Sequence, residues 1–185
     1  MGLPLEQIAL LLEEGLPLEQ MKGILRRKQV ELHQHLEEEQ AKLERVATVR
    51  GVIPTYAHIC DLFDELWSSL APQRTSFTGP AMAIYYDPEY REHDVDAEVA
   101  VPIAGELTLK GRIKVSVIPE ITQAACIIHH GGYETISSAY HHLMKWIEEN
   151  GYHIVGPHRE VYLQGPNDVK DPSGYGTEIQ VPVAK

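Results

Sequence analysis

The chain changes its pattern of hydrophobic positions near residue 50. Beyond that point apolar and polar residues alternate, most clearly over residues 95–103 and 177–183, as expected for β-strands with one buried face. Before that point the apolar residues follow a helical spacing. The pattern therefore predicts a helical segment over residues 1–49 and a β-rich domain over residues 50–185.

The N-terminal segment predicts two helices. The hexapeptide Gly-Leu-Pro-Leu-Glu-Gln stands at residues 2–7 and again at 15–20, and proline and glutamate both suit the first turn of a helix. We expect a short helix over residues 4–14 and a long one from residue 17 to about residue 50. Its narrow apolar seam consists of Leu25, Leu32, Leu36, Leu43 and Ala47. Such a helix needs a partner, which favours a coiled-coil homodimer; packing of the helix on its own domain is the alternative.

The β-rich domain contains an internal repeat. Its matching landmarks are residues 79–85 and 156–162, residues 97–102 and 177–182, and Trp67 and Trp146, at offsets of 77, 80 and 79 positions. Helical stretches surround the tryptophans, and strand candidates over about 46–59 and 112–130 precede them. The order predicts an α+β fold, a duplicated strand–helix–strand–strand unit, with a ligand cleft between the two halves.

Composition and charge exclude several classes of protein. Hydrophobic residues make up 43% and charged residues 23% of the 185 residues, which are ordinary values for a globular protein. The formal net charge is −11, of which residues 1–50 hold −2 and residues 51–185 hold −9. Because phosphate binding depends on basic patches, nucleic-acid binding by this chain is not expected.

Cysteines and apolar runs narrow the picture further. Cys60 and Cys126 are the only cysteines, so neither a disulfide framework nor a thiolate zinc site is expected. The first residues lack a signal-peptide pattern, and no apolar run is long enough to cross a bilayer. We expect a cytoplasmic protein with no membrane partner.

Glu160 is the strongest candidate for chemistry. It aligns with Ala83 in the other half of the repeat, so a carboxylate replaces a methyl group at a buried-type position. Buried without a partner, this carboxylate would have a raised pKa and would attract an organic cation. The alternative is a solvated strand face on which Glu160 pairs with Arg159 or His158.

No metal or cofactor is expected. The paired histidines 33/35, 129/130 and 141/142 suggest a metal site at first sight, but neighbouring positions on a helix point about 100° apart and cannot chelate one ion. Asp94, Asp96 and Glu98 share one strand face, where an acidic solvated surface is the simpler interpretation. The chain contains no phosphate-binding glycine loop and no nucleophile motif.

The β-rich domain resembles the GyrI-like effector-binding domain over about residues 47–183. Four segments in the right order carry the resemblance: residues 128–134, 146–152, 156–162 and 177–182. The N-terminal segment resembles the dimerisation helix of MerR-family regulators, and the whole chain resembles their multidrug-binding, BmrR-like members. This resemblance implies an antiparallel coiled-coil dimer and a pocket for hydrophobic, cationic small molecules.

The resemblance also implies which residues form the pocket. Glu160 occupies the position of a pocket glutamate in the strand before the last. Aromatic residues line the pocket in this group; Tyr133 and Tyr175 match in context, and Tyr56, Tyr85, Tyr162 and Trp146 are further candidates.

The chain departs from MerR regulators at its start, because about 70 residues of winged-helix reader normally precede this segment. A regulator fragment and a stand-alone sensor both fit, and no DNA binding is expected from the chain as given. One alternative function is a GyrI-like hydrolase that detoxifies reactive small molecules, with Glu160 as general acid or base, helped by Tyr133. Another is an interaction protein that sequesters a partner enzyme.

Overall fold

The computed structural model describes residues 44–185, apart from residues 74, 106 and 110. The helices expected over residues 4–14 and from residue 17, with the coiled-coil seam up to Leu43, lie outside the described residues. Residues 44–49, which that seam assigns to the long helix, belong instead to the first strand, in agreement with the strand candidate over about 46–59 from residue 46 onward. The physical reason is burial, because Val46, Ala47, Thr48 and Val49 are all fully buried and suit a strand covered on both faces.

The described part is an α+β domain with one antiparallel sheet and two α-helices. Its first half comprises β1 (Glu44–Ile53), η1 (Tyr56–His58), α3 (Ile59–Leu70), β2 (Ser76–Phe77), β3 (Met82–Tyr85) and β4 (Val95–Ala104). β5 (Lys114–Ile118) follows. The second half comprises β6 (Ala124–His130), η2 (Tyr133–Thr135), α4 (Ile136–Glu149), β7 (His153–Ile154), β8 (His158–Gln164), η3 (Pro172–Gly174) and β9 (Gly176–Ala184).

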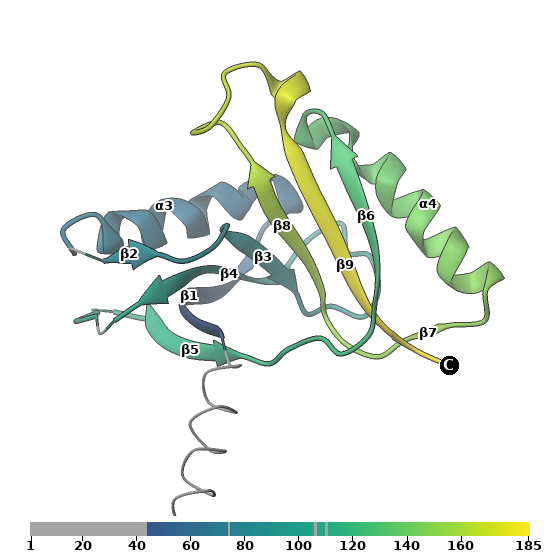
Figure 1. Cartoon of the computed structure of the whole chain (residues 1–185), viewed down its shortest axis with the longest axis horizontal. Coiled ribbons are helices and arrows are strands. Elements are labelled where there is room, and N and C mark those ends of the chain that lie inside the picture. Colours follow the sequence, from purple (N-terminus) through teal and green to yellow (C-terminus); the bar gives the residue numbers. More distant parts are fainter. Residues whose placement is uncertain (1–43, 74, 106, 110) are drawn as a thin grey trace, which may run out of the picture. The chain divides into compact units, whose positions relative to one another are not determined.

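The sheet joins the two halves through their central strands. Its order is β5-β1-β4-β3-β8-β9-β6, with β2 on β4 and β7 on β9, so each half contributes a strand, a helix and two further strands. β3 pairs with β8, and Ala83 lies directly opposite Glu160. β3 and β8 lie side by side where the halves meet (Figure 1), so the two residues that align in the repeat are neighbours in the sheet.

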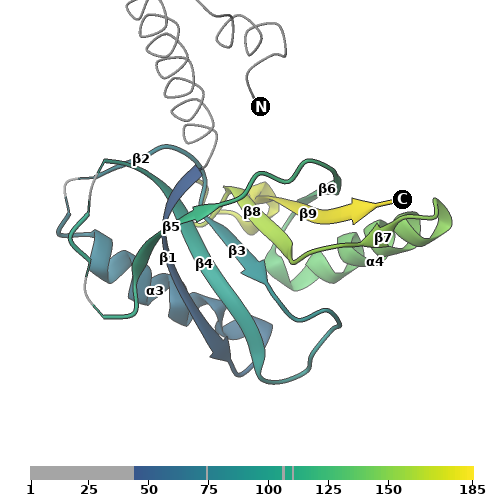
Figure 2. The same cartoon turned by 90° about the horizontal axis from the view of Figure 1, so that it is seen from below.

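Both helices cover the same face of the sheet (Figure 2). α3 buries Leu62, Leu66 and Leu70, and α4 buries Ala139, Leu143 and Ile147. The i, i+4 spacing of each triplet places it on one helix face. The two triplets stand 77 positions apart, the same offset as that between Ala83 and Glu160.

This offset corrects the alignment of the two tryptophans. At 77 positions Trp67 corresponds to Met144, and Trp146 lies two residues further along α4. Two residues turn a helix by about 200°, so the tryptophans point in different directions. Trp67 packs from α3 against the hydrophobic core, whereas Trp146 is 48% exposed.

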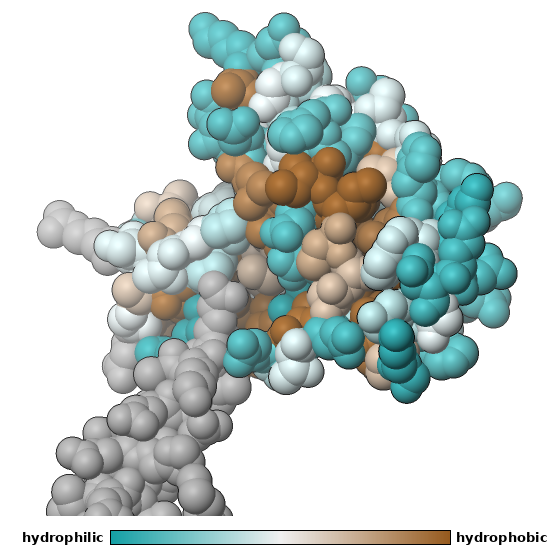
Figure 3. Space-filling model, turned by 45° about the vertical axis from the view of Figure 1, so that its right-hand side comes forward, coloured by the Kyte–Doolittle hydropathy of each residue, from teal (hydrophilic) through white to brown (hydrophobic). Residues whose placement is uncertain are grey.

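The other face of the sheet carries a smaller apolar cluster. It contains Val46, Met82, Ile84, Ala100, Ile118 and Val161. Ile128 on β6 remains half exposed. The space-filling view shows apolar residues gathered near the middle of the face that it presents, with hydrophilic residues around them (Figure 3).

Replacement of Leu66 tests whether α3 is anchored as described. Leu66 is fully buried, so Leu66→Ala should lower the free energy of unfolding by about 2–5 kcal/mol, measured by urea denaturation. Ser68→Ala, an exposed change on the same helix, is the control and should stay within about 0.5 kcal/mol of the parent chain. Equal effects of the two changes would contradict the described packing of α3.

Candidate functional site

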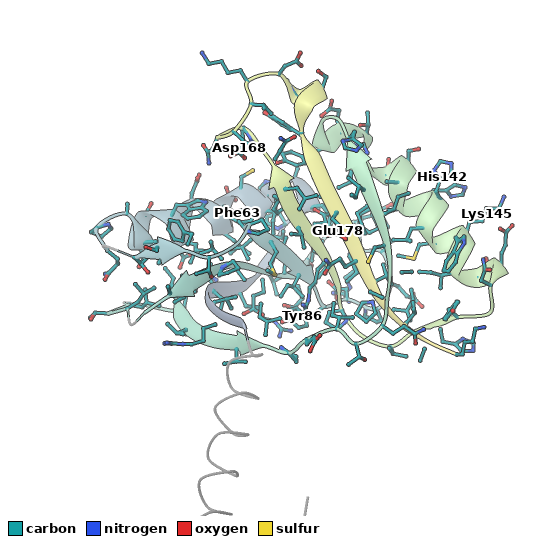
Figure 4. All side chains as sticks on the ribbon, in the orientation of Figure 1. Phe63, Tyr86, His142, Lys145, Asp168 and Glu178 are labelled. Atoms are coloured by element: carbon teal, nitrogen blue, oxygen red, sulfur yellow. The ribbon has the colours of Figure 1, made fainter. Side chains whose placement is uncertain are left out.

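A cavity of about 1130 Å³ opens between α3, the start of α4 and the central strands. Most of its lining is apolar or aromatic: Tyr56, Ala57, Ile59, Cys60, Phe63, Trp67, Phe77, Gly79, Pro80, Ala81, Tyr85, Val101, Tyr133, Ile136, Tyr162, Leu163, Gly165 and Pro166. The polar members are Asp64, Glu134, Glu160, Asn167 and Asp168. Figure 4 labels two members from separate elements, Phe63 on α3 and Asp168 in the connection that follows β8.

Glu160 is the buried carboxylate of this cavity, with 8% of its surface exposed. It lies directly opposite Ala83, a residue with a small side chain, in the register of β3 and β8. The Tyr140 hydroxyl donates a hydrogen bond to Oε1 at 2.8 Å, and the Tyr162 hydroxyl donates one to Oε2 at 2.9 Å. Both donors are neutral phenols, so the hydrogen bonds orient the carboxylate without adding positive charge.

Burial raises the pKa of Glu160 above its usual value, and the hydroxyls of Tyr140, Tyr162 and Tyr85 partly offset this rise. Burial also raises the pKa of each of these three tyrosines well above 10, with the charge of Glu160 as a further cause. The phenols therefore keep their protons near neutral pH and act as donors. The site holds a carboxylate whose ionised form is costly unless a positive charge arrives.

Four tyrosines surround Glu160 as two repeat-related pairs. Tyr56 and Tyr133 correspond at 77 positions, as do Tyr85 and Tyr162. The rings of Tyr56 and Tyr85 meet edge to face at 5.3 Å, and those of Tyr133 and Tyr162 at 5.7 Å. The aromatic frame thus follows the internal repeat, whereas the Ala83–Glu160 pair at its centre does not.

The described lining of the cavity carries negative charge only. Glu160, Asp64, Glu134 and Asp168 are its ionisable carboxylates, and the described lining contains no lysine, arginine or histidine. An anionic ligand would meet repulsion here, and a cation would be attracted.

The structure brings five of the seven predicted site residues to this cavity: Glu160, Tyr56, Tyr85, Tyr133 and Tyr162. Tyr175 does not line it; its buried ring lies behind that of Tyr133, with a centroid distance of 5.4 Å. Trp146 is also absent from the lining; it is half exposed and stacks on Tyr152 at 5.7 Å. This placement follows from the two-residue shift between the tryptophans.

Sequence analysis missed Tyr140, the second hydrogen-bond donor to Glu160. At the 77-residue offset Tyr140 corresponds to Phe63, which lines the cavity from α3 and meets Tyr162 edge to face at 5.6 Å. The buried triplets of α3 and α4 stand 77 positions apart, and this offset is what pairs Tyr140 with Phe63.

The two partners expected for Glu160 on a solvated strand face have other contacts. Arg159 donates a hydrogen bond to the Pro119 carbonyl at 3.1 Å, and His158 stacks on Tyr85 at 5.1 Å. Glu160 is buried and accepts hydrogen bonds from two tyrosines, so it does not lie on a solvated strand face.

Two features are absent from residues 44–185, with residues 74, 106 and 110 left aside. No three His, Cys, Asp or Glu side chains in this part gather in a group suited to a metal ion. No helix in the same part is both long and apolar enough to span a membrane.

Comparison with known proteins identifies the family. The model of the GyrI-like small molecule binding domain matches residues 36–184. The chain belongs to this family. The crystal structure of the EcmrR C-terminal domain is 31% identical, with a TM-score of 0.71, and the match covers 77% of this chain and 92% of that one.

Other solved structures share the fold of this GyrI-like chain. The cryo-EM structure of an EcmrR–DNA complex is 23% identical with a TM-score of 0.71, over 98% of this chain and 78% of that one. SAV2435 bound to tetraphenylphosphonium is 12% identical with a TM-score of 0.54, over 76% and 88%. A hydrolase from Listeria innocua is 12% identical with a TM-score of 0.50, over 76% and 87%. No curated protein sequence matches the chain.

The raised pKa of Glu160 predicts a pH-dependent stability difference. A carboxyl whose pKa is higher in the folded state stabilises fully below its unfolded pKa of about 4.3, and this contribution is lost as pH rises through the folded pKa. Relative to Glu160→Gln, the parent GyrI-like chain should therefore lose stability with rising pH, by about 1.4 kcal/mol for each unit by which the pKa is raised. Urea denaturation of both proteins across this range measures the difference, and a constant difference would contradict burial of an ionisable Glu160.

Proposed function

We propose that this GyrI-like domain binds bulky lipophilic cations without altering them chemically, and that it is the effector-sensing part of a MerR-type transcription regulator. The observation that carries the proposal is Glu160, a buried carboxylate that accepts hydrogen bonds from two neutral phenols and that belongs to an aromatic cavity with an acidic lining. Each further argument depends on this arrangement.

The energetics favour a cation of low hydration. Ionised Glu160 has lost most of its water, and its two tyrosine donors restore only part of that stabilisation. A ligand cation beside the carboxylate supplies the missing positive charge. The cation loses hydration when it enters the cavity, and this loss is small for an ion that binds water weakly. The faces of the surrounding tyrosines add cation–π attraction of about 0.5–2 kcal/mol each, depending on desolvation.

The shape of the site favours bulky and chemically varied ligands. A volume of about 1130 Å³ lies at the upper end of typical small-molecule sites. Flat aromatic walls attract apolar groups over a broad area and impose few directional contacts. SAV2435, whose structure contains tetraphenylphosphonium, shares this fold and supports the choice of a lipophilic cation as the probe.

The regulator role draws its support from EcmrR. Its C-terminal domain is the 31% identical match, and a second EcmrR structure is a complex with DNA. We extend this relationship to the present chain as a sensor whose N-terminal segment, residues 1–43, joins two copies. In this proposal ligand binding biases the arrangement of the dimer, and DNA contact belongs to other parts of such a regulator.

Hydrolysis is the second candidate function. A Glu160 carboxyl with a raised pKa suits general acid–base chemistry, and a hydrolase of the same fold is known from Listeria innocua. The family description, a small molecule binding domain, favours binding alone. Incubation with an activated ester of a lipophilic cation, followed by mass spectrometry, separates the two candidates. An unchanged ester supports the sensor, and turnover that Glu160→Gln abolishes would establish the hydrolase.

Removal of the buried charge tests the binding proposal. Calorimetry with tetraphenylphosphonium should show that Glu160→Gln weakens binding by about 10- to 100-fold, equivalent to about 1.4–2.7 kcal/mol. The affinity for triphenylphosphine oxide, a neutral molecule with three phenyl groups in place of four, should change by less than about threefold.

Glu98→Gln is the matched control for this experiment. Glu98 is also 8% exposed and also accepts a tyrosine hydroxyl, that of Tyr86 at 2.5 Å, but it is not part of the cavity lining. The control should keep the cation affinity of the parent chain. If both substitutions weaken cation binding equally, Glu160 has no specific role.

The proposed dimer predicts a defined mass in solution. Sedimentation equilibrium of the full 185-residue chain should give about twice the 20.8 kDa of one chain, as expected for a closed two-fold assembly. A monomer at all concentrations would remove the dimeric sensor from the proposal and leave ligand binding untouched.

A further inference from the structure

His158 lies beside the tyrosine cage, the four tyrosines 56, 85, 133 and 162 that surround Glu160, but it is not part of the cavity lining. It stands opposite Tyr85 in the β3–β8 pair, with ring centroids 5.1 Å apart and planes inclined by 26°. The ring of Tyr140 meets it edge to face at 5.4 Å. His158 therefore contacts Tyr85, one of the four tyrosines around Glu160, and Tyr140, which donates a hydrogen bond to Glu160.

The internal repeat shows what His158 replaces. At the 77-residue offset it corresponds to Ala81, which lies beside Tyr162 and accepts a backbone hydrogen bond from it at 3.0 Å. Ala81 belongs to the cavity lining together with Gly79 and Pro80. The same position is thus small and open in the first half of the repeat, and filled by an imidazole in the second.

A second replacement closes the same side. Phe63 of α3 lines the cavity, whereas its counterpart Tyr140 of α4 reaches Glu160 with its hydroxyl and packs against His158. His158 and Tyr140 together occupy the space beside Glu160 on the α4 side. The cavity opens on the other side of Glu160, the α3 side, where Phe63 and Ala81 lie and where only the start of α4 borders it.

We propose that His158 is a specificity-determining residue, which closes the α4 side of Glu160 and braces Tyr85 and Tyr140, so that ligands reach the carboxylate only from the α3 side and only up to a limited size. This inference rests on the proposed binding of cations at Glu160. It assigns to His158 the position and size of the site, whereas Glu160 determines the preferred charge.

The imidazole performs this role without a charge. Burial lowers the pKa of His158 to about 4, so the ring is neutral near pH 7. The ionisable groups around it are the two tyrosines that it contacts and Glu160, two residues along the same strand. A neutral His158 leaves the charge of Glu160 available to a ligand.

Size selectivity provides the test, with two cations of equal charge. Affinities for rhodamine 6G, which is large, and methyltriphenylphosphonium, which is smaller, are measured by fluorescence and calorimetry. His158→Ala should shift the ratio of the two affinities at least about fivefold towards the larger cation, in line with the effect of small volume changes in a pocket. His158→Phe, which keeps a flat ring without a titratable group, should retain the parent ratio.

Ala81 offers a second route if His158→Ala fails to fold. Ala81→Leu should fill the open side and weaken the binding of both cations at least about tenfold, with thermal unfolding as the check that the variant is folded. An unchanged ratio in folded His158→Ala, or full affinity in folded Ala81→Leu, would overturn the inference. If the parent chain binds neither cation, or if Glu160→Gln binds both normally, the proposed function itself fails.

Discussion

The site depends on one electrostatic constraint: a carboxylate is buried between two halves of a sheet, and the described lining of its cavity contains no lysine, arginine or histidine. Glu160 accepts hydrogen bonds from Tyr140 and Tyr162, which orient the group but leave its charge uncompensated. A natural sequence retains such a cost where the group has a function. The cavity, its acidic lining and the four tyrosines around Glu160 all fit a site in which a ligand supplies the missing positive charge.

Glu98 shows that burial of a carboxylate alone does not make a cation site. It is as buried as Glu160 but lies on the other face of the sheet, where the Thr48 hydroxyl and the Tyr86 hydroxyl donate to its two oxygens. The guanidinium of Arg50 lies 3.5 Å from the centre of the Tyr86 ring. A cation of the protein itself therefore adjoins Glu98, whereas the described lining around Glu160 contains none.

Much of this arrangement was predictable from periodicity and internal comparison. Alternation located β4 and β9, and the 77-residue offset paired Ala83 with Glu160, which the sheet register places face to face. The alignment of the two tryptophans was wrong because residues of the same type need not occupy equivalent positions in a repeat. A shift of two positions along a helix turns the side chain to nearly the opposite side. The helix was extended wrongly to about residue 50, over the start of the predicted strand at about residue 46, because a heptad seam and a buried strand can share the same apolar residues. Tyr140 required knowledge of which helix face packs on the sheet, and this depends on tertiary contacts.

Proton linkage tests the central claim most directly. If a cation compensates Glu160, its binding must favour the ionised carboxyl and expel a proton wherever that carboxyl is protonated in the free protein. Calorimetric titration with tetraphenylphosphonium, in buffers of different ionisation enthalpy between about pH 4.5 and about pH 8, measures this release. The account predicts release of up to one proton per ligand below the folded pKa of Glu160, fading above it, and no release from Glu160→Gln. Binding by the parent chain with no proton release at any pH would contradict it.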